Sequence, residues 1–195
     1  MRLIVGISGA SGVRIAIKLL QQLKALDVET HLVITHGAEL TVRHETNFDP
    51  FSIRQLADKF YGVDDIDAAI ASGSFAHDGM IIVPCSMKTV AGIAVGYADN
   101  LLLRAADICL KEHRRLVIVP REIPLSRIHL RNLKELADNG AIILPPMLTF
   151  YNVPSTIEEQ IDHIVGKILM QFGLPPLTPP WNPSEKMSVE MTDAD

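Results

Sequence analysis

Short apolar runs alternate with amphipathic segments along most of this chain. The runs at 3–7, 29–34, 79–84, 116–120 and 141–145 are short and almost continuously apolar, as in strands buried on both faces. Helical periodicity predicts helices near 13–26, 38–45, 89–95, 100–112, 126–139 and 155–172. This alternation predicts a single-domain α/β fold, a three-layer, doubly wound parallel sheet of Rossmann or flavodoxin type. The stretch 47–74 is less regular.

Local signals mark two helix boundaries. Asn139-Gly140 is typical of a helix end, and Ser155-Thr156-Ile157-Glu158 has the spacing of a capping box at a helix start. After Gly173 the chain is rich in proline, which favours an extended segment. We therefore expect a folded domain over 1–173 and a C-terminal tail over 174–195 that wraps a surface or a partner.

Charge and composition exclude several classes of protein. A formal net charge of -5 and a pI near 5.8 give no electrostatic basis for nucleic-acid binding. The apolar runs are far shorter than a membrane span, and the first breaks at Gly6, unlike a signal peptide. Cys85 and Cys109 lie in apolar contexts and predict free thiols, so we expect a cytoplasmic protein. The hydrophobic share of 48% favours a homo-oligomer, and a large core is the alternative explanation.

The first turn is the strongest local indication of a ligand. A buried strand enters Ser8-Gly9-Ala10-Ser11-Gly12 and then a helix, which directs backbone N–H groups and the positive end of the helix dipole toward an anion. A phosphate-bearing ligand suits this turn. The spacing of Gly6, Gly9 and Gly12 also fits a loose dinucleotide fingerprint, so the turn alone leaves nucleotide and flavin open.

The other predicted strand ends add groups that can bind phosphate and move a proton. Parallel strands bring their carboxyl ends to one edge, where ligands bind in doubly wound folds. The segments at that edge are Thr35-His36-Gly37, Cys85 to Thr89, Arg121-Glu122 and Pro146 to Tyr151.

The sequence lacks the residues that three other kinds of site would need. The second strand ends without the acidic residue of an NAD site, and no Tyr-x-x-x-Lys pair occurs. The histidines show no metal-ligand spacing, so we expect no metal. Cys85 suits packing better than nucleophilic catalysis, since no activating pair accompanies it. The run Asp64-Asp65-Ile66-Asp67 is typical of a solvated surface.

Five blocks, in order, resemble the motifs of the UbiX-type flavin prenyltransferases, which were long described as aromatic-acid decarboxylases. The resemblance covers about residues 2 to 181. The blocks are Gly9-Ala10-Ser11-Gly12, Pro84 to Thr89, Arg104 to Glu112, Val119 to Glu122 and Pro145 to Tyr151.

The resemblance implies transfer of a dimethylallyl group from dimethylallyl monophosphate to N5 and C6 of reduced FMN, without a metal. The product, prenylated FMN, would serve a partner UbiD-type decarboxylase. The family's dodecameric assembly would place the sites at subunit interfaces.

The resemblance also implies a role for each matching residue. Glu122 corresponds to the acid/base glutamate, and Ser11, Glu45 and Lys111 belong with it to the catalytic set. Trp181 would help to close the pocket. FMN would contact Gly9, Ala10, Ser11, His36, Ser86, Met87, Lys88, Thr89 and Arg121. The prenyl phosphate would contact Tyr151, Lys167, Lys111 and Arg104.

One block departs from the family, and two alternatives remain. Thr35-His36-Gly37 stands where the family has Ser-Lys-Ala, so either the His36 ring or the Thr35 hydroxyl would contact the flavin phosphate. An FMN-dependent cysteine decarboxylase has a similar fold but a Pro-x-Met-Asn motif, whereas this chain has Pro84-Cys85-Ser86-Met87. A non-catalytic FMN-binding accessory subunit would not need Lys111, Arg121, Glu122 and Tyr151.

Overall fold

The computed structural model describes residues 1–178, which fall into two compact units. The first unit is residues 1–147 and holds the whole sheet, and the second begins at Leu148. Trp181 lies outside the described residues, as does most of the predicted tail. The predicted boundary at residue 173 stays a prediction.

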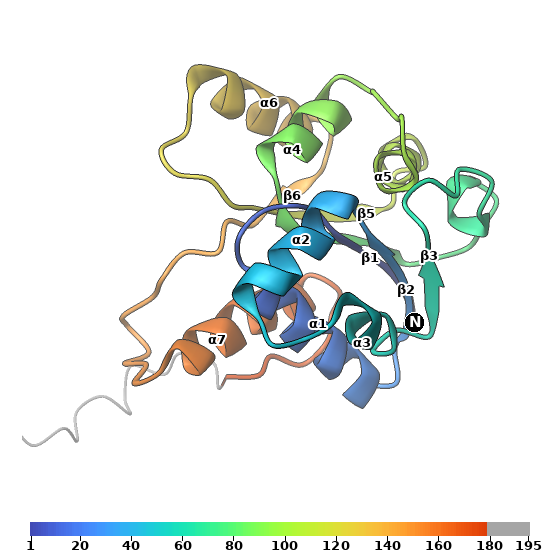
Figure 1. Ribbon diagram of the computed structural model, residues 1–195. Coiled ribbons are helices and arrows are strands. Elements are labelled where there is room, and N and C mark those ends of the chain that lie inside the picture. Colours follow the sequence, from blue (N-terminus) through green and yellow to red (C-terminus); the bar gives the residue numbers. More distant parts are fainter. Residues whose placement is uncertain (179–195) are drawn as a thin grey trace, which may run out of the picture. The chain divides into compact units, whose positions relative to one another are not determined.

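Six parallel strands form one sheet in the order β3-β2-β1-β4-β5-β6 (Figure 1). This order confirms the predicted doubly wound fold and is the Rossmann order, which reverses between β1 and β4. The strands are β1 (Arg2–Ile7), β2 (Glu29–Ile34), β3 (Lys59–Tyr61), β4 (Gly79–Cys85), β5 (Arg115–Pro120) and β6 (Ile142–Ile143).

The predicted helices are all present, and the irregular stretch contains three further short elements. The edge strand β3, the helix α3 (Pro50–Arg54) and the 3-10 turn η1 (Ala69–Ala71) all lie within 47–74. The second unit contains α7 (Ile157–Met170). The remaining helices are α1 (Val13–Ala25), α2 (His36–Glu45), α4 (Met87–Ala94), α5 (Leu101–Lys111) and α6 (Arg127–Asp138). None of the helices in residues 1–178 is both long and apolar enough to cross a bilayer.

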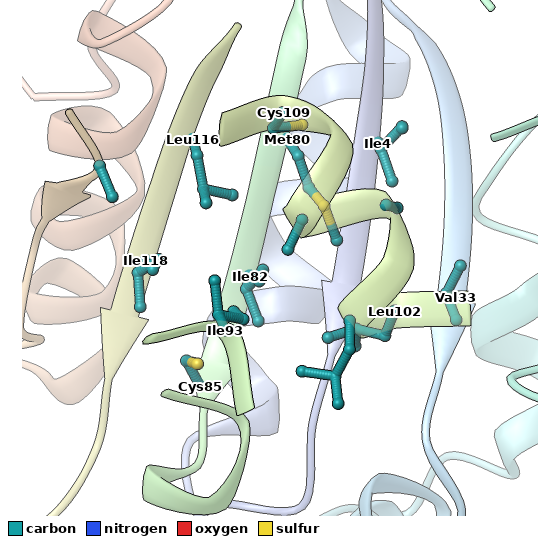
Figure 2. Close-up of a cluster of buried hydrophobic side chains, with 14 of the residues drawn as sticks. Ile4, Val33, Met80, Ile82, Cys85, Ile93, Leu102, Cys109, Leu116 and Ile118 are labelled. Carbon is teal, nitrogen blue, oxygen red and sulfur yellow. The ribbon is translucent and has the colours of Figure 1, made fainter. Parts of the chain in front are cut away.

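Alternating strand residues supply the two faces of the sheet. Ile4, Met80 and Leu116 are fully buried and point toward α4 and α5 (Figure 2). Their sequence neighbours, such as Leu3 and Ile81, are equally buried and point to the opposite face, where α1 packs on the sheet. Each fully buried aliphatic side chain contributes roughly 1.5–3 kcal/mol to folding. Figure 1 shows α4, α5 and α6 on one side and α1 on the other.

The predicted helix boundaries agree with the structure to within a residue or two. Helix α6 ends at Asp138, and Gly140 adopts a φ of +90, which confirms the predicted end. The start of α7 is shifted by one residue from the prediction, because Thr156 is the N-cap and accepts from the Glu159 N–H. The Glu159 carboxylate also accepts the Ser155 N–H at 2.6 Å, whereas the predicted box paired Ser155 with Glu158. These backbone and side-chain donors hold the pKa of Glu159 below its usual value.

Candidate functional site

The carboxyl ends of β1 and β4 meet at the point where the strand order reverses. Ser8 is buried there, and its hydroxyl donates to the Pro84 carbonyl at 3.0 Å. The same Oγ accepts the Ser86 N–H at 2.7 Å. One side chain therefore joins the turn after β1 to the start of α4, in the crevice where doubly wound folds bind ligands.

The turns after β1 and β2 touch through their backbones. A Cβ placed on Gly9 would lie 2.9 Å from the carbonyl carbon of Gly37, too close for any side chain. Gly12, the N-cap of α1, has a φ of +107, a left-handed conformation that favours glycine. The close packing of Gly9 and Gly37 brings the start of α2 against the first turn.

The start of α1 is occupied by a carboxylate from the protein itself. Glu45, the last residue of α2, accepts the N–H groups of Gly12 at 2.8 Å and Val13 at 3.1 Å. Such an acceptor satisfies the first amides of the helix and complements its dipole. The sequence assigned this place to a ligand anion, whereas in the structure the anion is Glu45.

Thr35 and His36 form the start of α2. Thr35 is the N-cap, and its hydroxyl accepts the Ala38 N–H at 3.2 Å. The His36 ring is exposed and pairs with Asp64 at 3.0 Å, from Nε2 to Oδ2. Thr35 therefore has the local position expected of the family's serine, and His36 is directed to a neighbouring loop.

Hydroxyl groups also gather at the start of α4. Ser86 is the N-cap and accepts the Thr89 N–H at 3.3 Å, and the two hydroxyl oxygens lie 3.0 Å apart. Met87 is buried and Lys88 is exposed. Beneath them, burial raises the pKa of the Cys85 thiol, so Cys85 stays protonated and acts as a packing residue.

The loop after β5 brings the predicted arginine and glutamate to the same edge. The Arg121 N–H donates to the Cys85 carbonyl at 3.0 Å, so the ends of β4 and β5 stay joined. Both the Arg121 and Glu122 side chains are exposed, and Glu122 accepts only the N–H of its neighbour Ile123, at 3.1 Å, among the described contacts. Both side chains therefore lie exposed at the carboxyl edge of the sheet.

Helix α5 separates two residues that the sequence assigned to one site. Its first residue, Leu101, donates to the Val63 carbonyl just beyond the end of β3, and Arg104 pairs with Asp107 in the following turn. Lys111, the last residue, pairs with Glu112 a few residues before β5 begins. Lys111 thus lies at the amino edge of the sheet, opposite Ser11 and Arg121, and one chain does not bring these residues together.

The second unit brings Tyr151 beside the middle of α7. The Tyr151 hydroxyl lies 3.1 Å from Nε2 of His163, and the two rings meet edge to face. Lys167 follows His163 by one helical turn and is exposed. Burial lowers the pKa of His163, and the nearby Lys167 lowers it further. The loop therefore brings Tyr151 within about one turn of Lys167, despite their separation in sequence.

The chain matches a known family over most of its length. A family model described as Flavoprotein matches residues 1–173. A probable UbiX-like flavin prenyltransferase of Sedimentibacter hydroxybenzoicus is 58% identical over 89% of this chain and 93% of its own. The chain belongs to the UbiX-like flavin prenyltransferases.

Solved structures agree with this family membership. A dodecameric FMN-dependent UbiX-like decarboxylase from Escherichia coli O157:H7 is 49% identical with a TM-score of 0.92, covering 93% of this chain and all of that one. AnUbiX (PadA1), in complex with FMN and dimethylallyl pyrophosphate, is 48% identical with a TM-score of 0.92 over 93% and 97% of the two chains. By contrast, the FMN-dependent cysteine decarboxylase SpaF is 22% identical with a TM-score of 0.61, which shows a shared fold alone.

The structure of this UbiX-like chain adds two residues that the motifs did not indicate. His163 contacts Tyr151, and its spacing of four from Lys167 was the available signal. Asp64 contacts His36 from a run that the sequence suggested was only solvated surface, and no local pattern links the two. Within residues 1–178, no group of three or more His, Cys, Asp and Glu is arranged to hold a metal ion.

Proposed function

We propose that this chain is a flavin prenyltransferase that moves a dimethylallyl group from a dimethylallyl phosphate to N5 and C6 of reduced FMN. The C–O bond to phosphate breaks, and the prenyl carbons form new bonds to N5 and C6 of the flavin. N5 and C6 each lose a proton, and the prenyl double bond takes one up. The observation that carries the proposal is the convergence of hydroxyl, amide and cationic groups from four strand ends at one edge of the sheet.

The residues of this edge fit a flavin mononucleotide. The start of α2 offers the first-turn amides of His36 and Gly37, for which no acceptor is recorded in the described structure. Because Glu45 already fills the start of α1, the start of α2 is the better place for the flavin phosphate. We assign the phosphate to Thr35 and His36, and the remaining FMN contacts to Gly9, Ala10, Ser11, Arg121 and the segment Ser86, Met87, Lys88 and Thr89.

The prenyl phosphate needs cations and hydroxyl donors on its leaving oxygen. We assign these contacts to Tyr151 and Lys167, with His163 orienting the Tyr151 hydroxyl. Arg104 and Lys111 belong to the same set. Lys111 lies at the amino edge of its own sheet, so we assign it to the site of a neighbouring subunit. A dodecamer like that of the Escherichia coli relative would allow this arrangement.

Glu122 is the proposed acid/base group. Its carboxylate is exposed at the edge where FMN would lie and is not neutralised by an ion pair among the described residues. A carboxylate in this position can take the proton released during bond formation and return one during ring closure. We keep Ser11 and Glu45 in the catalytic set: Ser11 lies in the first turn, and Glu45 holds that turn through the Gly12 N–H.

The proposed partners are the prenyl donor and the enzyme that would use the product. The sequence contains no Asp-Asp-x-x-Asp motif of a magnesium site, which favours a monophosphate donor. AnUbiX is in complex with dimethylallyl pyrophosphate, so the pyrophosphate is the donor to compare with it. Prenylated FMN would pass to a UbiD-type decarboxylase. The buried thiols of Cys85 and Cys109 are free, consistent with a cytoplasmic location.

Mass spectrometry of the flavin tests the proposal. The protein, loaded with reduced FMN under anaerobic conditions, is given dimethylallyl monophosphate or pyrophosphate in parallel. We expect the flavin to gain the mass of one prenyl group, and Glu122→Gln to bind FMN with unchanged affinity but to turn over at least about tenfold more slowly. Added to an apo UbiD-type decarboxylase, the product should restore its activity.

The accessory-subunit alternative predicts a different result. An FMN-binding carrier would hold the flavin and leave its mass unchanged with either donor. Retained FMN binding without prenylation would therefore reject the transferase and support the carrier. Unchanged turnover of Glu122→Gln would remove Glu122 from the acid/base role and leave the rest of the proposal intact.

A further inference from the structure

Asp64 and His36 form an exposed pair that bridges two loops. Nε2 of His36 lies 3.0 Å from Oδ2 of Asp64, with 75% and 78% of the two side chains exposed. His36 is the first residue of α2, and Asp64 belongs to the loop between β3 and η1. A surface pair this exposed contributes little to folding.

The loop that carries Asp64 is anchored on both sides of it. The Val63 carbonyl accepts the N–H of Leu101, the first residue of α5, at 2.8 Å. Asp65 accepts the Gly62 N–H at 2.8 Å and closes the turn. Asp64 therefore projects from a fixed backbone, as a residue that orients another side chain must.

The partner of Asp64 lies at the start of α2. His36 adjoins Gly37, whose backbone packs against Gly9 of the first turn. We propose that Asp64 is a positioning residue, which holds the His36 ring so that its second nitrogen donates to the flavin phosphate. This inference rests on the proposed function, because it takes FMN as the ligand of this edge.

The ring chemistry explains why the partner is a carboxylate. A carboxylate only accepts, so Asp64 takes the Nε2–H of His36, and a ring that carries a proton on both nitrogens has a second N–H on Nδ1 to donate. A phosphate on the Nδ1 side would place such a ring between two anions. A lysine at position 36 would be a cation on a flexible stem that needs no such partner to orient it. The His36 ring needs a partner to orient it, and Asp64 is that partner.

Titration of the apo protein with FMN and with riboflavin, followed by flavin fluorescence, tests the inference. The two ligands share the ring and ribityl chain, and only FMN carries the phosphate. We expect Asp64→Asn to weaken FMN binding by about threefold to tenfold and to change riboflavin binding by less than about twofold. Asp67→Asn, which removes the same charge from an exposed position in the same loop, is the matched control and should leave both affinities unchanged.

A rescue variant separates positioning from a structural role. In the double variant His36→Lys with Asp64→Asn, the lysine restores the cation without needing an oriented ring, so FMN affinity should return to within about twofold of the wild type. Equal weakening of both flavins, a matching loss in Asp67→Asn, or no rescue by lysine would each overturn the inference. Tight FMN binding by the wild type, with prenylation, keeps the proposed function standing in each of those cases.

Discussion

Helices α1 and α2 begin next to each other at the same edge of the sheet, yet their first turns differ in what they offer. The start of α1 is closed by the Glu45 carboxylate, which accepts two of its amides. The start of α2 has only the cap of its own Thr35, whose hydroxyl accepts a single amide. One helix start is satisfied from within the protein, and the other has amides left for a ligand.

This difference shows that a glycine turn before a helix does not identify the phosphate site by itself. Every helix start favours an anion, and the protein can provide one. Which start remains for a ligand depends on side chains that arrive from other elements, here Glu45 from the far end of α2. Two experiments, the one with the larger expected effect first, test the contrast.

Gly9→Ala should break the arrangement outright. The new Cβ would lie 2.9 Å from the Gly37 carbonyl carbon, so the two turns must move apart. We expect a loss of about 1–3 kcal/mol in the free energy of unfolding and at least a tenfold loss in FMN affinity. Chemical denaturation and flavin titration measure the two effects.

The reciprocal substitution is the control. In Gly37→Ala the nearest atom to the new Cβ is the Gly9 Cα at 3.4 Å, an ordinary contact, and alanine is favoured over glycine in a helix. Its stability should stay within about 1 kcal/mol of the wild type. Equal losses in both variants would show that the close approach of the two turns is not the cause.

Glu45→Ala should make the two helix starts alike. Removal of the carboxylate leaves the amides of Gly12 and Val13 without their acceptor, and we expect a loss of about 1–2 kcal/mol in stability. Inorganic phosphate should then raise the melting temperature of the variant more than that of the wild type, because a second helix start accepts it. Glu45→Gln, which keeps an acceptor without the charge, should show a smaller loss. Identical phosphate effects in all three proteins would mean that Glu45 does not block the start of α1.

The pH dependence of stability contains a contribution that belongs to neither helix start. Burial and Lys167 lower the pKa of His163, so the unfolded chain binds a proton that the folded protein releases. Stability from this group is therefore full above a pH of about 6.5 and falls as the pH drops through the lower, folded-state pKa. In His163→Gln the free energy of unfolding should decline less with falling pH, by less than about 1 kcal/mol. Urea denaturation between pH 5 and pH 8, roughly the range in which histidine titrates, measures this decline. An unchanged slope would assign the decline to other groups, such as His77, whose pKa burial also lowers.

The hydrophobic pattern was sufficient for the sheet, with one exception. Strands β1, β2, β4 and β5 are buried over nearly their whole length, and buried strands leave continuous apolar runs. The edge strand β3 has three residues and begins with the exposed Lys59, too little for a pattern to indicate. Its pairing with β2 comes from tertiary structure.

The candidate site could be predicted only in part, because contacts between distant segments decide it. The motifs placed Ser86, Thr89, Arg121 and Glu122 correctly at the edge of the sheet, since each follows a strand. They did not show that Glu45 binds the start of α1, nor that α5 carries Lys111 to the other edge. Those two facts depend on helix length and direction, which a motif does not contain.

The length of α2 sets the position of the Glu45 carboxylate. In its first turn Gly37 packs against Gly9, and at its end Glu45 accepts amides at the start of α1, so one helix of ten residues connects both contacts. Insertion of a single residue would turn Glu45 by about 100° and advance it by about 1.5 Å, taking its carboxylate away from Gly12 and Val13. The contact of Glu45 with α1 therefore depends on the residue count of α2 rather than on the side chains along its exposed side. In this fold, the spacing along α2 decides which helix start keeps amides free for an anion.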